Sequence, residues 1–416
     1  MESEIVASRS AEAASSSVAL ASLSLATLMS SLGTSIANVA LPTLAHSFQA
    51  TFPQVQWVVL AYLLASTALV VSVGRLGDVT GRRRLLLAGI GVFTAASLAC
   101  SMAPSLLWLI VARAVQGGGA AIMLALTMAV AASTVSKARA GSAIGLLAAM
   151  AAVGTALGPS AGGLLIATFS WRALFFMNVP LGLLTLGLAY QSLPNDRATG
   201  ETRVHQPLFQ SAMFRHSLVR RSLVMLALVS TVMMATLVVG PFYLSRALNL
   251  NAAAVGFTMS AGPIVAALTS VPAGRIADRF GFARTSIIGL VATVVGSTAL
   301  ALLPASSGIV GYLLPIAFLT GGYAVFQTAN NTGLMTHVGA TERGVISGLL
   351  SLARNLGLIS GASVMGAVFA YASGSTDIDA SDAAAVATGM RTTFAVAAML
   401  VLVALAIAVG NRRSPE

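Results

Sequence analysis

Residues 74–84 read GRLGDVTGRRR, and residues 274–284 read GRIADRFGFAR. Five positions are identical at a distance of 200 residues: Gly74, Arg75, Asp78, Gly81 and Arg84 recur as Gly274, Arg275, Asp278, Gly281 and Arg284. Each segment is short and charged and lies between two long apolar runs. Because glycine adopts backbone conformations that other residues avoid, each segment predicts a tight turn between two helices.

A second echo lies further along each half. Residues 154–163 read GTALGPSAGG, and Gly145, Leu146, Leu147, Gly154 and Gly158 recur 203 residues later as Gly348, Leu349, Leu350, Gly357 and Gly361. Two echoes at nearly the same distance indicate that one unit was duplicated. Parallel repeats of this kind place a substrate site between the halves, near the middle of a membrane.

The composition requires a membrane as the solvent. Of the 416 residues, 57% are hydrophobic and 8% are charged, whereas soluble domains carry about 25% charged residues. One span needs roughly 20 apolar residues. We therefore predict an all-α membrane protein whose twelve transmembrane helices form two pseudo-symmetric bundles of six. The predicted spans are 18–41, 55–74, 85–103, 106–130, 142–167, 173–190, 222–245, 254–274, 285–304, 309–333, 344–371 and 392–410.

The net charge of +11 predicts orientation rather than a nucleic-acid partner. With both termini in the cytoplasm, 18 Lys and Arg residues face inward and 3 face outward, namely Arg172, Arg246 and Arg391. This is the asymmetry of the positive-inside rule. The predicted organisation is a cytoplasmic tail (1–17), a first six-helix bundle (18–190), a cytoplasmic linker (191–221), a second bundle (222–410) and a cytoplasmic tail (411–416). Residues 207–221 are equally consistent with a short surface helix and with a solvated linker.

On these motifs the sequence resembles the major facilitator superfamily. GRLGDVTGRRR is similar to the signature between the second and third spans of that family. LIVARAVQGGGAA at 109–121 is similar to its RxxQGxG signature, and the GxxxGPxxGG spacing at 154–163 to that of its exporter branches. IANVALP at 36–42 and SWRALFFMNVPLG at 170–182 resemble the drug–proton antiporter branch that usually has fourteen spans. The resemblance implies a multi-pass transporter of the bacterial inner membrane that exports drugs or metabolites by alternating access.

Two departures from that branch matter. Residues 191–221 are too short for an extra pair of spans, and Gly33 stands where the branch usually has an Asp. None of the twelve acids falls inside a predicted span, so proton coupling is in doubt and would have to use Asp78, His46 or the substrate. Because Arg113 and Arg354 fall within spans, we expect neutral or anionic small molecules to be preferred.

The expected site has two parts. The gating and conformational set is Gly74, Arg75, Asp78, Gly81, Arg82, Arg84, Gly274, Arg275, Asp278, Gly281, Arg284, Gly154, Gly158, Pro159, Gly162 and Gly163. The substrate-binding set is Thr34, Asn38, Arg113, Gln116, Gln327, Asn330, Asn331, Arg354 and Asn355. For any single polar residue of the second set, solute binding and a purely structural hydrogen bond between helices are equally consistent with the sequence. For Arg113, a cavity or gating role is favoured over a purely structural hydrogen bond, because a central arginine needs an interior partner or water.

Other classes of function fit less well. The sequence has no paired carboxylates, no nucleophile–base arrangement, no ATP-binding loop and no metal-ligand spacing among its four His and one Cys. We therefore expect no enzyme, no cofactor and no metal, and a monomer in the bilayer. Uptake or uniport by the same fold remains an alternative, as does a membrane receptor or assembly factor that does not transport.

Overall fold

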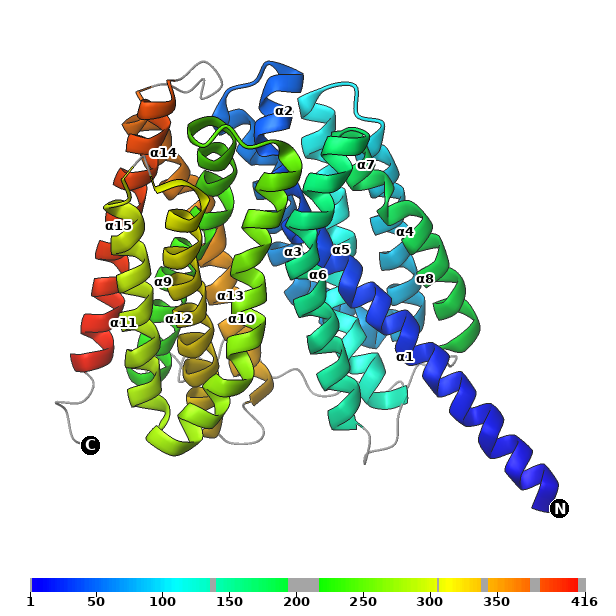
Figure 1. The fold of residues 1–416 in the computed structure, drawn as a ribbon. Helices are drawn as coiled ribbons and strands as arrows, with labels where there is room; N and C mark the ends of the chain where they lie inside the picture. The colour runs from blue at the N-terminus through cyan, green and yellow to red at the C-terminus, as the bar shows by residue number, and fades with distance from the viewer. Residues whose placement is uncertain are drawn as a thin grey trace. The chain divides into compact units, whose positions relative to one another are not determined.

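A computed structural model describes residues 2–134, 140–193, 217–304, 307–337, 343–374 and 382–410, and all regular structure in these ranges is helical (Figure 1). The elements of the first half are α1 (Glu2–Val39), α2 (Leu41–Phe48), α3 (Phe52–Thr80), α4 (Arg82–Ser101), α5 (Leu106–Thr134), α6 (Ala140–Thr168), α7 (Trp171–Phe176) and α8 (Asn178–Ser192). Those of the second half are α9 (Ser217–Phe242), η3 (Tyr243–Ala247), α10 (Ala252–Phe280), α11 (Phe282–Ala301), α12 (Gly308–Thr336), α13 (Arg343–Ser360), η5 (Gly361–Met365), α14 (Gly366–Ala372) and α15 (Ala383–Gly410). The elements η3 and η5 are single turns of π-helix.

Within the described ranges, 12 helical segments are long and apolar enough to cross a membrane. All twelve predicted spans are confirmed, but the last one begins earlier than predicted, at Ala383 instead of residue 392. The cause is a run of alanine before Arg391, since alanine is the best helix former. Arg391 therefore lies inside α15 and not in the preceding loop. Asp278 also lies within a helix, in the last turns of α10.

The two charged turns of the repeat have the same backbone. Gly81 precedes α4 with φ 92°, and Gly281 precedes α11 with φ 81°. These φ values are strained for residues with a side chain. The predicted tight turns are confirmed at both positions. Each connects two helices without an intervening loop, so the charges of the motif lie at helix ends.

The described chain separates into two compact units. Unit 1 comprises Met1–Ala37 and Ala61–Thr202, and unit 2 comprises Asn38–Leu60 and Arg203–Glu416. In unit 1, α4 packs against α5, α7 and α8. In unit 2, α11 packs against α12 and α15, and α9 packs against α13 and α15. The segment 38–60 comes from the first half of the sequence and yet belongs to unit 2. Most of the predicted linker, residues 194–216, lies outside the described residues, and Ser217 begins α9.

Gly154 and its counterpart in the repeat, Gly357, make the same kind of contact in the two units. In unit 1, a Cβ on Gly154 would stand 2.6 Å from the Leu28 carbonyl oxygen and 3.1 Å from the Ser31 Cβ. In unit 2, a Cβ on Gly357 would overlap the Ala227 carbonyl oxygen and stand 2.7 Å from the Ser230 Cβ. Each glycine therefore lets α6 or α13 approach the backbone of the first helix of its own half. Close approach at small residues is typical of membrane helices.

The orientation can be tested with reporter fusions. Reporters fused after Ser192 and after Ser373 are expected to report the cytoplasmic and the outer side, respectively, because an odd number of spans lies between them. Alkaline phosphatase, active only outside, and green fluorescent protein, fluorescent only inside, give opposite signals at each site. The same side at both positions would contradict the twelve-span topology.

Candidate functional site

The charged centre of unit 1 is Arg113 on α5, which is fully buried. Its Nη1 donates to the Gln116 Oε1 over 2.5 Å, and its Nη2 donates to the Gly33 carbonyl over 3.1 Å. Gln116 is also fully buried and extends the hydrogen-bond network, because its Nε2 donates to the Ser97 Oγ over 2.7 Å. The spacing of three residues places Arg113 and Gln116 on one helix face, as predicted. The network joins α1, α4 and α5.

Aromatic rings enclose the Arg113 guanidinium. Its central carbon lies 4.2 Å from the ring centroid of Tyr62 and 5.8 Å from that of Phe175. Such cation–π contacts are worth about 2 kcal/mol or more when they are desolvated. The Tyr62 hydroxyl in turn donates to the Ser30 carbonyl over 2.9 Å. Arg113 and Gln116 are thus enclosed by protein, and neither side chain faces open space in this conformation.

Gly33 is the point where the sequence departs from the pattern of the resembling branch. A Cβ there would stand 3.1 Å from the Phe93 ring and 3.3 Å from the Tyr62 hydroxyl. The space beside Gly33 is therefore already filled by aromatic side chains. Its carbonyl, rather than a carboxylate, receives the hydrogen bond from Arg113. The centre of unit 1 is consequently built around an amide carbonyl acceptor at this position.

Five of the polar residues predicted in unit 2 lie on α12 and α13. Gln327 on α12 is half-buried, and its Nε2 donates to the Tyr323 hydroxyl over 3.1 Å. Asn330 is buried, and its Nδ2 makes no hydrogen bond within the described part of the chain, nor does Oδ1 of Asn331. A buried polar atom without a partner is uncommon and suggests an occupant such as water or a ligand.

Arg354 differs from Arg113 because it is exposed, although it lies in the middle of the span Val345–Ala372. Ser347 and Ser351 are exposed on the same face of α13, at positions i−7 and i−3 from it. Asn355, next to Arg354, is half-buried. An exposed arginine at mid-membrane is tolerated when it faces a water-filled cavity. The exposure of this face of α13 agrees with the prediction that Arg354 binds solute, which stays a prediction.

The other two predicted binding residues are on α1. Thr34 is half-buried, and its hydroxyl donates to the Ser30 carbonyl over 3.1 Å. Asn38 is buried and belongs to unit 2. The structure therefore places the predicted binding residues in two groups, with Thr34, Arg113 and Gln116 in unit 1 and the remaining six in unit 2.

The residues of α6 that were predicted to gate include a tight helix contact. A Cβ on Gly158 would overlap the Ser35 Oγ and stand 2.9 Å from the Ser35 Cβ. The Ser35 hydroxyl already donates to the Gly154 carbonyl over 3.4 Å. Pro159, Gly162 and Gly163 follow on the same helix and are buried. The contact between α6 and α1, which we call the seam, thus has no room for a side chain at Gly158.

The charged motif is only partly described. The backbone of Gly74, Arg75 and Asp78 belongs to α3, but the surroundings of these three residues are not among those described. In the second repeat, Asp278, Arg275 and Arg284 are exposed, and Gly274 is half-buried. In the first repeat, Arg82 is half-buried and Arg84 is exposed. The role predicted for these charges in gating stays a prediction.

One arginine contact next to this motif has no signal in the sequence. Nη2 of Arg83 donates to the Tyr190 carbonyl over 2.6 Å, and its guanidinium lies 5.3 Å from the Tyr190 ring centroid. The sequence predicts for Arg83 only a charge that faces the cytoplasm. The contact joins the start of α4 to the end of α8 within unit 1.

Sequence reasoning also missed an aromatic cluster in unit 2. Phe52, at the start of α3, lies 4.9 Å from Phe242 and 5.2 Å from Phe369 between ring centroids. One turn later, the Gln56 Nε2 donates to the Ala362 carbonyl in η5 over 3.0 Å. A Cβ on Gly366 would overlap the Gln56 amide. We call Phe52, Gln56, Phe242 and Phe369 the outer cluster, after the side on which the predicted orientation places them. The only signal in the sequence was the recurrence of Phe near helix ends.

The residues that the structure describes contain no group of three or more His, Cys, Asp or Glu that could hold a metal. The single cysteine, Cys100, is buried in α4.

Comparison with known proteins gives a consistent picture. A sequence model of the Major Facilitator Superfamily matches residues 23–362. The chain is 26% identical over 390 residues to the riboflavin transporter RibZ of Clostridioides difficile, and the alignment covers 82% of this chain and 86% of RibZ. It is 43% identical over 157 residues to the multidrug resistance protein Stp of Mycobacterium tuberculosis, covering 37% of this chain and 29% of Stp. It is 34% identical over 177 residues to the methylenomycin A resistance protein of Streptomyces coelicolor, covering 42% and 37%.

Solved structures share the fold at low sequence identity. A bacterial homolog of the human lysosomal transporter Spinster superposes with a TM-score of 0.80 and 16% identity, covering 97% of this chain and 99% of that chain. The nucleoside transporter NupG superposes with a TM-score of 0.77 and 13% identity, covering 95% and 99%.

Proposed function

Because the chain belongs to the Major Facilitator Superfamily and is a multi-pass membrane transporter, we propose that it exports small neutral or anionic organic molecules by alternating access. Export is secondary-active, takes place in the bacterial inner membrane with both termini in the cytoplasm, and involves a monomer without a cofactor. The observation that carries the proposal is the seam between α6 and α1, where Gly158 contacts Ser35 so closely that a Cβ would overlap its Oγ. The glycines of this seam have the spacing that resembles exporter branches.

The names of two relatives support export. Stp is a multidrug resistance protein, and a second relative confers methylenomycin A resistance, judging by its name. Each aligns with less than half of this chain, so they support the class of function and not a particular solute.

The placement of charge supports the choice of neutral or anionic solutes. Arg354 is exposed in the span Val345–Ala372, and the orphaned amide atoms of Asn330 and Asn331 lie on α12. Asp278, in the last turns of α10, is the one acid within the spans of the described residues, and it lies far from the span's centre. A site lined by an arginine and amides favours a carboxylate or a hydrogen-bonding neutral group over a cation. We propose that Gln327, Asn330, Asn331, Arg354 and Asn355 contact the solute.

Arg113 and Gln116 have a different role in this proposal. Because both are fully buried, we propose that they hold α1, α4 and α5 together in unit 1, so that Thr34 and its neighbours on α1 are correctly placed. Thr34 and Asn38 are then the solute contacts on α1. The charged turns at Gly74–Arg84 and Gly274–Arg284 are proposed to stabilise one state of the transport cycle.

Uptake by the same fold is the second candidate. The long alignment with a protein named as a riboflavin transporter covers 82% of this chain. That name is compatible with either direction of transport. The alternative of a non-transporting receptor has no comparable support, because the relatives named here are transporters or resistance proteins.

An untargeted comparison of metabolites tests the proposed direction. Cells that lack the gene and cells that overproduce the protein are grown side by side, and both medium and cell extract are analysed. Export predicts that at least one neutral or anionic organic compound rises in the medium and falls in the cells of the overproducing strain. The reverse change for every affected compound would support uptake instead.

The outer cluster yields a prediction about the transport cycle. Its contacts hold the first turns of α3 on α9, η5 and α14 of unit 2. Alternating access requires such contacts to break when the outer side opens. A Phe52→Ala, Gln56→Ala double variant is therefore expected to favour the outward-open state, because two T-shaped pairs and one buried hydrogen bond are lost, roughly 2–4 kcal/mol in total.

The measurement is labelling from outside with a membrane-impermeant maleimide at Val55→Cys, a buried position between Phe52 and Gln56 on α3, in a Cys100→Ala background. Labelling should be several-fold faster in the double variant. A matched control is Phe169→Ala, which removes an exposed ring outside the cluster. Equal labelling rates in the double variant and the parent would contradict the gating role of the outer cluster.

A further inference from the structure

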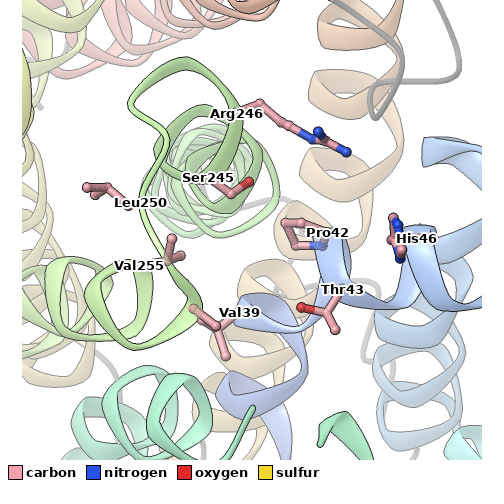
Figure 2. Close-up of a pocket in the computed structure, with 9 residues that line it drawn as sticks. Val39, Pro42, Thr43, His46, Ser245, Arg246, Leu250 and Val255 are labelled. Atoms are coloured by element: carbon pink, nitrogen blue, oxygen red, sulfur yellow. The ribbon is translucent and has the colours of Figure 1, made fainter. Parts of the chain in front are cut away.

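A pocket of about 300 Å³ lies within unit 2, between the end of α1, α2, η3 and the start of α10 (Figure 2). Its described lining residues are Val39, Pro42, Thr43, His46, Ser245, Arg246, Leu250, Ala252 and Val255. It is separate from the polar residues of α12 and α13 proposed to contact the solute. Ligand pockets in proteins begin at about this volume.

The pocket has an apolar side and a polar side. Val39, Leu250 and Val255 form the apolar side. Thr43, His46 and Arg246 supply polar groups, and none of the nine lining residues is acidic. In Figure 2 the Arg246 side chain extends from η3 toward the side where α2 carries His46. An arginine fork binds a carboxylate with two parallel hydrogen bonds, and an imidazole can donate a third.

The backbone that carries Arg246 is held in place. The Leu248 N–H donates to the Tyr243 carbonyl over 3.2 Å, and the Leu250 N–H donates to the Leu244 carbonyl over 3.1 Å. Tyr243 stacks on Tyr312 with 5.8 Å between ring centroids. Single π-turns such as η3 occur frequently at functional sites. The cationic wall is thus preorganised, which lowers the entropic cost of binding.

We propose that this pocket binds an organic monoanion, a carboxylate with a compact apolar body. Arg246 and His46 hold the carboxylate, and Val39, Leu250 and Val255 cover the apolar body. A small inorganic anion would leave that apolar wall in contact with water. The position of the pocket on the outer side of the membrane rests on the proposed orientation, and there the ligand is either the exported solute on its way out or an anion from outside.

Equilibrium binding tests the site without any transport. The full chain is reconstituted in nanodiscs of phosphatidylcholine, and binding of 4-fluorobenzoate is followed by ¹⁹F NMR, with the neutral 4-fluorobenzamide as the matched ligand. Arg246→Gln is expected to weaken benzoate binding about tenfold or more, since a charge-assisted hydrogen-bond pair is lost. His46→Gln should weaken it less. Arg220→Gln, an exposed arginine at the other end of α9, should bind like the wild type.

A second variant does not alter charge. Thr43→Trp fills the pocket and should abolish benzoate binding, while thermal unfolding shows that the variant is folded. The site is overturned if wild type and Arg246→Gln bind benzoate equally, or if the benzamide binds as tightly as the benzoate. Either result leaves the proposed export untouched, because the metabolite comparison does not depend on this pocket.

The source of the anion is resolved by protecting a cysteine in oriented vesicles. In a Cys100→Ala, Ser245→Cys variant, an impermeant maleimide is added outside, and an anion is supplied on one side only. Because benzoate crosses bilayers as its neutral acid, the one-sided anion is 4-fluorobenzenesulfonate, which stays charged. Protection by sulfonate loaded inside identifies the exported solute as the ligand, and protection only by external sulfonate identifies an outside anion. Both results support the site, whereas the absence of protection from either side contradicts it.

Discussion

A Gly158→Leu variant is expected to insert into the membrane and to lose transport by about tenfold or more. Even a Cβ at this position would overlap the Ser35 Oγ and stand 3.2 Å from the Ile36 backbone nitrogen. The Ser35 Oγ can rotate, but the Ser35 Cβ, 2.9 Å away, is fixed to the backbone of α1 and cannot move aside. Overpacking of this kind costs typically about 1–3 kcal/mol, and here the cost falls on the contact between α6 and α1. Transport of the identified solute is measured in cells with equal amounts of protein in the membrane.

The same helix provides the control. A Cβ on Gly145 has no atom within 4 Å, so Gly145→Leu should transport normally. A second-site change tests the cause. Gly158→Ala should also reduce transport, because its Cβ meets the Ser35 Oγ and Cβ. Adding Ser35→Gly removes both of these atoms and should restore most of the transport. Normal transport by Gly158→Leu, or no rescue by Ser35→Gly, would show that this contact does not govern transport.

An Arg113→Leu variant is expected to lose both stability and transport. The change leaves the Gln116 Oε1 and the Gly33 carbonyl without the donor that each now has. The Gly33 carbonyl keeps its bond within α1, so one buried polar atom, the Gln116 Oε1, is left unsatisfied, at a cost of about 1–3 kcal/mol. Loss of the stacking on Tyr62 adds to this. The midpoint of thermal unfolding in detergent should fall by several degrees, with transport reduced about tenfold or more.

A series of variants with graded losses distinguishes the contribution of this hydrogen-bond network from a general loss of stability on any substitution in α5. Ser97→Ala removes the hydroxyl that accepts from Gln116 and donates to the Phe93 carbonyl, and should cost less than Arg113→Leu, about 1 kcal/mol. Arg113→Lys should lie between the two, because a lysine cannot form the planar fork. If Arg113→Leu unfolds at the same temperature as the wild type, the network does not stabilise unit 1.

The spans, the duplication and the tight turns at Gly81 and Gly281 were predictable from sequence, because each depends on local composition. A run of about 20 apolar residues must span the membrane whatever surrounds it. The start of α15 was missed, because the small residues before Arg391 carry little hydropathy and yet form helix readily.

The π-turns η3 and η5 and the outer cluster were not predictable. A π-turn inserts one residue into a helix without changing its apolar composition. The contact of Gln56 with Ala362 joins residues 306 positions apart, and no pattern in either segment indicates that the two are in contact. The sequence predicts that both Arg113 and Arg354 lie within spans. The structure shows the difference between them, because Arg113 is enclosed and Arg354 is exposed.

The central claim is that this transporter exports neutral or anionic solutes and needs no carboxylate at mid-membrane. The most direct test is transport of the solute found in the metabolite comparison, in proteoliposomes of known orientation, with membrane potential and pH gradient imposed separately. Moving one anionic charge out of a negative interior gains about 2.3 kcal/mol per 100 mV. We predict that for an anionic solute the potential alone drives export, and that an imposed pH gradient alone does not. Strict dependence on the pH gradient, with a permanently cationic solute and full activity of Asp78→Asn, would contradict the claim.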